Sequence, residues 1–70
     1  MQASDRLVHM ANQIARNFAI LGEEKAVAAT NDHIVKFWDP RMRQLIEAHV
    51  NAGGAGLSPV ALLATKALRK

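Results

Sequence analysis

Apolar residues recur at spacings of three and four along most of the chain, which is the period of amphipathic α-helices. No segment shows the strict alternation of apolar and polar residues that is typical of a half-buried β-strand. The pattern therefore predicts an all-α fold: a small single domain over residues 1–70, with three longer helices and a short C-terminal helix. The predicted helices span residues 5–21, 24–38, 40–50 and 59–68.

Two Xaa-Pro pairs predict where the last two helices begin. Asp39 and Ser58 are favoured N-cap residues, because their side-chain oxygens accept hydrogen bonds from free amides of the first turn. Pro40 and Pro59 then suit the first helical position, where a missing N–H costs nothing. Proline also disfavours helical geometry in the preceding residue, so the second helix is predicted to end near Trp38.

The second predicted helix carries the bulkiest apolar side chains. One stripe of this helix contains Val27, Thr30 or Asn31, Ile34 and Trp38, and Val35 and Phe37 widen the stripe on either side. The other positions predicted to face the core are Leu7, Met10, Ala11, Ile14, Phe18, Leu21, Met42, Leu45, Ile46, His49, Val50, Val60, Leu63, Ala64 and Ala67.

The composition limits how such a fold can be stabilised. The chain has 70 residues and no cysteine, so neither a disulfide nor a thiolate-bound metal can hold it together. A domain of this size buries only about 60% of its unfolded surface. The chain is therefore expected to gain stability by forming a homo-oligomer or by docking on a larger partner.

Charge and hydropathy argue against several classes of protein. The formal net charge of +3 is small and dispersed, which argues against binding to nucleic acid. There is no run of about 18 apolar residues, so no membrane span is expected. The N-terminal residues lack the apolar run of a secretory signal, so a cytoplasmic location is predicted.

The histidines do not follow a metal-binding pattern. His9, His33 and His49 fall on three different predicted helices, and none has a second ligand at a metal-binding spacing. No Ser-His-Asp set and no pair of catalytic carboxylates can be assigned either. We therefore predict no catalytic, cofactor-binding or metal-binding residue in this chain.

A glycine-rich stretch, residues 52–58, separates the last two predicted helices. It lacks the preceding strand and the lysine of a phosphate-binding loop, so it is interpreted as a helix-breaking linker. Gly54, Gly56 and Ser58 would still expose backbone N–H groups. An anionic group on a partner could use these donors, which makes Gly54 and Gly56 candidate partner-binding residues.

Trp38 and Arg41 are the other candidate partner-binding residues. Arg43 follows Asp39 by four positions, in the acid-first order that favours an ion pair on a helix. Arg41 has no acid at that spacing on either side, so it is expected to be free for a partner. Tryptophan and arginine are the residue types most enriched at binding hot spots.

Three segments resemble one family. They read "RLVHMANQIARNF", "DHIVKFWDPRMRQLI" and "AGGAGLSPVALLA" in this order, and the similarity covers about residues 6–64. Together they resemble the delta subunit of the cytoplasmic NAD-dependent, molybdenum- or tungsten-containing formate dehydrogenase. The most specific part is the block that contains "FWDPRMR".

The resemblance implies a non-catalytic accessory subunit of a complex that oxidises formate to carbon dioxide and reduces NAD. The alpha subunit would carry bis-molybdopterin guanine dinucleotide with molybdenum or tungsten, and iron–sulfur clusters. The beta subunit would hold FMN and the NAD site, and the gamma subunit another iron–sulfur cluster. The delta subunit would carry no cofactor, and would support holoenzyme assembly, molybdenum cofactor insertion and stability of the complex.

In such a complex the alpha subunit is the expected direct partner. Ile34 and Phe37 would point into the core, while Arg41 and part of Trp38 would face the partner. Two other classes stay open on the sequence alone. One is a self-associating helical interaction module unrelated to redox enzymes, and the other, less favoured, is a small basic nucleic-acid-binding domain.

Overall fold

Four α-helices and two short 3₁₀-helices make up the structure. The computed structural model describes residues 3–69. The described part contains no strand, so the all-α prediction is confirmed. The elements are α1 (Ala3–Phe18), η1 (Ala19–Leu21), α2 (Glu23–Phe37), α3 (Pro40–Asn51), α4 (Pro59–Lys66) and η2 (Ala67–Arg69).

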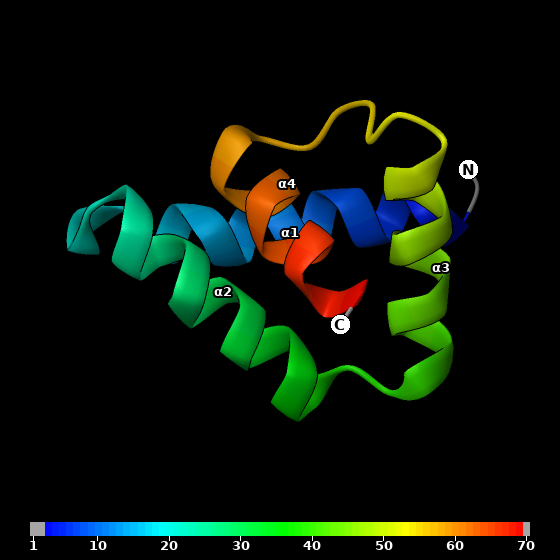
Figure 1. Ribbon diagram of the computed structural model, residues 1–70, viewed down its shortest axis with the longest axis horizontal. Coiled ribbons are helices and arrows are strands. Elements are labelled where there is room, and N and C mark those ends of the chain that lie inside the picture. Colours follow the sequence, from blue (N-terminus) through cyan, green and yellow to red (C-terminus); the bar gives the residue numbers. More distant parts are fainter. Residues whose placement is uncertain (1–2, 70) are drawn as a thin grey trace.

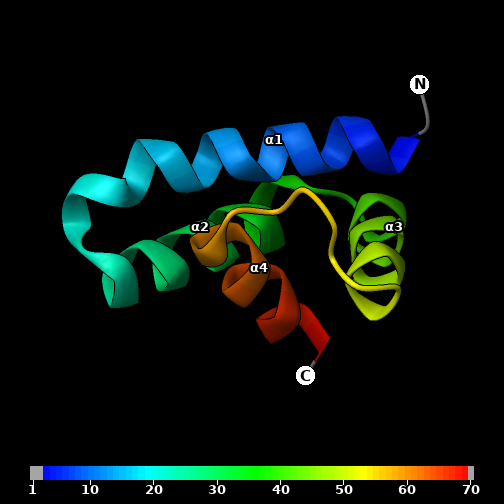
Figure 2. The ribbon, with the colours of Figure 1, turned by 90° about the horizontal axis from the view of Figure 1, so that it is seen from above.

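The helix α1 forms one layer, and the other three α-helices pack together on one side of it (Figure 2). From the turn at η1, α2 runs back at an angle to α1, and α3 stands across the far end of α1 (Figure 1). The short helix α4 contacts α1, α2 and α3. The last α-helix therefore closes a core that the other three leave open.

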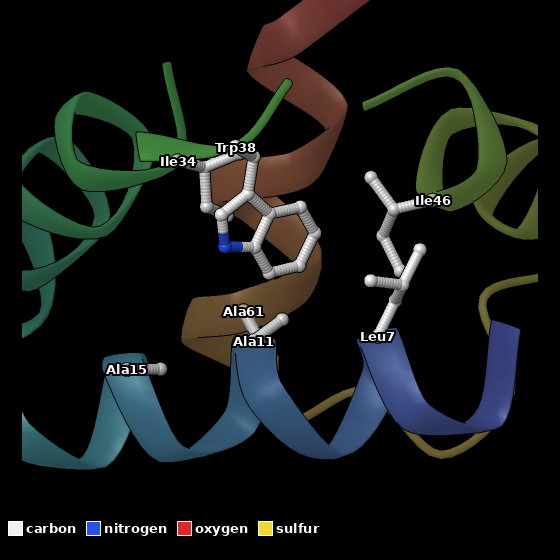
Figure 3. Packing of buried hydrophobic residues seen from close by; sticks show 7 residues of the cluster. All are labelled: Leu7, Ala11, Ala15, Ile34, Trp38, Ile46 and Ala61. Carbon is white, nitrogen blue, oxygen red and sulfur yellow. The ribbon is translucent and has the colours of Figure 1, made fainter. Parts of the chain in front are cut away.

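The core is built around Trp38 and a set of alanines. Only 5% of the surface of Trp38 is exposed. Its indole lies beside residues from α1, α3 and α4 (Figure 3). Because alanine adds little volume, the helices can approach closely around this one large ring. The buried cluster consists of Leu7, Ala11, Ala15, Ile34, Trp38, Ile46 and Ala61.

The two neighbouring aromatic residues at the end of α2 take the opposite places from those predicted. Phe37 is 71% exposed, whereas Trp38 is buried. Phe37 is the last residue of α2, and Trp38 has left the helix with an extended backbone (φ −88°, ψ 137°). The Trp38 amide still donates to the Ile34 carbonyl oxygen over 2.9 Å, so the Trp38 side chain stays on the buried face of Ile34 while the chain after it leaves the helix. The prediction that Phe37 points inward and part of Trp38 faces outward is therefore wrong.

Other predicted faces are partly wrong. Four further residues are exposed although each was predicted to face the core: Leu21, Val35, Leu45 and Leu63. On α4 the buried residues are Ala61, Ala64 and Thr65, so this helix is rotated away from Leu63. The threonine hydroxyl is accommodated because Thr65 Oγ1 donates to the carbonyl oxygens of Ala61 and Leu62, at 2.8 and 3.0 Å.

Side-chain caps begin both α3 and α4. The amide of Met42 donates to Asp39 Oδ1 over 2.8 Å, and Pro40 occupies the first turn of α3. At α4, the amide of Ala61 donates to Ser58 Oγ over 3.3 Å, and a proline again fills the first turn. The shorter bond at Asp39 involves a charged acceptor, which makes it the stronger cap.

Removing the α3 cap should weaken the fold measurably. We expect Asp39→Ala to lower the free energy of unfolding by about 0.5–2 kcal/mol, because the Met42 amide loses its acceptor. Urea denaturation followed by circular dichroism measures this change. Asp32→Ala is a matched control: it removes the exposed ion pair with Lys36, whose N–O distance is 3.1 Å. The control should cost about 0.5 kcal/mol or less, and equal losses would contradict the role of the cap.

Candidate docking surface

The glycine-rich loop between α3 and α4 has backbone angles that favour glycine. Gly53, Gly54 and Gly56 have φ values of 124°, 67° and 85°. Gly54 is also buried, and a Cβ placed on it would lie 2.7 Å from Leu62 Cδ1. At Gly54, therefore, the backbone favours glycine, and a side chain would also displace the end of Leu62.

Asn12 on α1 holds this loop in place. Its Nδ2 donates to the Gly56 carbonyl oxygen over 2.9 Å, and its Oδ1 accepts from the Ser58 amide over 2.8 Å. His49 Nε2 also lies 2.7 Å from the Ala55 carbonyl oxygen. The sequence analysis missed Asn12, because a single asparagine inside an amphipathic helix carries no signal of a partner more than 40 residues away.

These contacts leave little of the loop for an anion. The Ser58 amide donates to Asn12, and the Gly54 amide donates to the His49 carbonyl oxygen over 2.9 Å. Gly54 therefore offers neither surface nor a free donor to a partner. Gly56 is exposed, and stays a predicted partner-binding residue.

The two arginines of α3 differ in exposure. Arg41 is exposed on the first turn, whereas Arg43 is half-buried and its Nε has no hydrogen-bond partner. The predicted ion pair between Arg43 and Asp39 is not formed: among residues 4–68, whose side chains the structure describes, the single ion pair joins Lys36 and Asp32. The Asp39 carboxylate caps α3 instead. Arg41 stays a predicted partner contact, and Trp38, being buried, has little surface to offer.

Three neighbouring aromatic rings form the most distinctive feature of the described surface. The ring centroids of Phe18 and His33 are 6.4 Å apart in an edge-on arrangement. Those of His33 and Phe37 are 4.6 Å apart and tilted. Phe18 and His33 are half-buried, and Phe37 is exposed. We call these three residues, from α1 and α2, the aromatic strip.

The remaining exposed apolar side chains are scattered. Two of them, Ile20 and Leu21, lie in the turn between α1 and α2, and the others are Val35 on α2, Leu45 on α3 and Leu63 on α4. Single exposed apolar residues of this kind are ordinary on protein surfaces. The aromatic strip differs from them because its members contact one another across two helices.

An open groove of about 590 Å³ lies between α1 and the start of α4. Arg16 and Glu23 place opposite charges on its wall, and Asn12 and Ser58 are already hydrogen-bonded within the protein. The groove therefore lacks the free groups of one sign that an anion or a metal ion would need. Elsewhere in residues 3–69 there is no cluster of three or more metal-ligating side chains.

The described helices also include none with the length and hydropathy of a membrane span. What the surface offers is an aromatic strip and an exposed arginine on a small helical scaffold. These features define a small helical protein that is suited to contact with another protein.

The family model of the NADH-dependent formate dehydrogenase delta subunit FdsD matches residues 6–65, and the chain belongs to this family. The resemblance predicted from the three sequence segments is confirmed, and the protein is a subunit of a formate dehydrogenase complex. No curated protein and no solved structure matches the chain.

Proposed function

We propose that this delta subunit is a non-catalytic accessory subunit that promotes assembly of a cytoplasmic, NAD-dependent formate dehydrogenase. Its proposed roles are to support insertion of the molybdenum cofactor and to stabilise the complex, which oxidises formate to carbon dioxide and reduces NAD. The observation that carries the proposal is the family match, which extends over residues 6–65 of the 70-residue chain.

The redox groups are proposed to lie on the other subunits. The alpha subunit would hold bis-molybdopterin guanine dinucleotide with molybdenum or tungsten, and iron–sulfur clusters. The beta subunit would hold FMN and the NAD site, and the gamma subunit a further cluster. The absence of cysteine from the delta chain supports this placement for the iron–sulfur clusters, which cysteine thiolates ligate.

The alpha subunit is the proposed direct partner, with beta and gamma in the same complex. A protein that binds only the folded form of its partner stabilises that form by mass action, by about 2.7 kcal/mol at 100 times the dissociation constant. A delta subunit bound to a cofactor-free alpha subunit would hold it folded until the cofactor enters. Arg41, exposed on α3, is a proposed contact in this complex.

Deleting the delta subunit tests this function. We expect cells that produce alpha, beta and gamma without it to yield an alpha subunit with severalfold less molybdenum or tungsten. Formate-dependent reduction of NAD should fall in the same proportion. Elemental analysis of the purified complex measures the metal per alpha subunit, and supplying the wild-type delta chain should restore it. Equal metal content and equal thermal stability of the complex with and without delta would overturn the proposal.

A further inference from the structure

We infer that the aromatic strip is the face by which this subunit docks on the alpha subunit. Phe37 is the residue that inserts, and the partner supplies an apolar pocket with carboxylates at its rim. The inference rests on the proposed function, because it names the surface through which that function is exercised. It starts from the exposure of Phe37, at 71%, next to a tryptophan that is buried.

Phe37 is held in position before any partner binds. Trp38, the next residue, is fixed in the core and so fixes the backbone from which Phe37 projects. On the preceding turn, His33 contacts the Phe37 ring, and Phe18 supports His33 from α1. Binding a side chain that is already positioned costs little conformational entropy. An aromatic ring presented in this way is a typical hot-spot residue.

The segment that carries His33 and Phe37 has a small positive excess, which suits an acidic partner. Asp32 is paired with Lys36, and Asp39 accepts the cap hydrogen bond of α3. Over residues 32–43 the side chains carry two negative charges and three positive ones, which leaves a net charge of +1. Within the described residues the imidazole of His33 makes no hydrogen bond, so it can donate to a carboxylate on the partner.

A second copy of this chain fits the strip less well. A stable interface buries about 800 Å² on each partner, which is roughly a sixth of the 4710 Å² that this molecule exposes. Three residues cannot supply that area on a self-complementary face, and two copies would bring the same positive charge together. A pocket on a larger subunit can enclose Phe37 completely, and a few central anchors then carry most of the binding energy.

Pull-down with a tagged alpha subunit, co-expressed with beta, gamma and each delta variant, tests the docking face. We expect Phe37→Ala to weaken retention strongly, corresponding to roughly a 30-fold higher dissociation constant. Val35→Ala is the matched control, since it truncates another exposed apolar residue of α2 that lies outside the strip. The control should be retained like the wild type. Each variant should keep the circular-dichroism spectrum and thermal midpoint of the wild type.

A second variant keeps the test decisive if Phe37→Ala alters the fold. His33→Ala removes the central ring and the proposed donor, and it should also weaken retention while Val35→Ala does not. If both strip variants are retained as well as the wild type, the docking face is wrong. The proposed function still holds in that case if deletion of the delta subunit lowers the metal content. Failure of the wild-type chain to co-purify would overturn the proposed function itself. A third outcome is that the wild-type chain does not co-purify with the alpha subunit but forms a homodimer. If Phe37→Ala abolishes that homodimer, the strip binds a second copy of the chain and the inference is overturned.

Discussion

Trp38→Ala is expected to remove about half of the stability of the fold. The side chain is 5% exposed and is the largest member of the buried cluster. Truncating a buried tryptophan to alanine costs about 3–5 kcal/mol. A 70-residue domain has a total stability of about 4–10 kcal/mol, at 0.05–0.15 kcal/mol per residue. Neighbours such as Ala11 and Ala61 are too small to fill the cavity.

Circular dichroism with urea denaturation measures this loss, and Phe37→Ala provides the contrast on the adjacent residue. Because Phe37 projects into solvent, its truncation should change the free energy of unfolding by about 0.5 kcal/mol. The large effect at Trp38 and the small effect at Phe37 follow directly from their opposite burial. A larger loss at Phe37 than at Trp38 would contradict this arrangement of the core.

Gly54→Ala is expected to cost about 2 kcal/mol or more. The left-handed backbone (φ 67°) alone disfavours any residue with a Cβ by about 1–2 kcal/mol. The new methyl group would also lie 2.7 Å from Leu62 Cδ1, so the end of that side chain must move. Urea denaturation again gives the loss of stability.

Gly56→Ala separates the two causes. Gly56 also has a positive φ, of 85°, but its added Cβ would meet only Val8 Cγ1, at 3.4 Å. This variant should therefore show the backbone cost without the clash. If the two alanine variants lose the same stability, the contact with Leu62 contributes nothing. Combining Gly54→Ala with Leu62→Ala should recover part of the loss, as expected for residues in direct contact.

The features that the sequence predicts well are local ones. The four helices follow from the spacing of apolar residues, and the starts of α3 and α4 follow from a capping residue and a proline within four positions. These interactions depend on residues within one helical turn. They are therefore visible without knowledge of how the helices pack.

The arrangement of Phe37 and Trp38 agrees with the helical period. Each residue of an α-helix turns the side-chain direction by about 100°, so a residue four positions after Ile34 lies on the same face as Ile34. Trp38 occupies that position and is buried with Ile34, whereas Phe37 lies off this face and is exposed. The expectation that Phe37 points inward departed from this rule, because it treated aromatic bulk as a sign of the core.

Contacts between distant segments also escaped prediction. Asn12 bonds to the loop before α4, and Asn31 Nδ2 donates to the Ala64 carbonyl oxygen over 2.9 Å. Polar residues with such roles look like ordinary solvent-facing positions in the sequence. Thr65 was overlooked for a related reason, since its burial depends on hydrogen bonds to its own helix.

The hydrogen bonds between Asn12 and the glycine-rich loop have a consequence for folding during synthesis. Asn12 and Ser58 are 46 positions apart. At about 5–20 residues per second, a ribosome adds Ser58 roughly 2–9 s after Asn12. Until α4 has been added, α1 and α2 lack the helix that packs against both of them. We therefore expect the fold to be completed only after α4 has emerged, and the apolar surface exposed before then to be the part of the nascent chain most prone to aggregation.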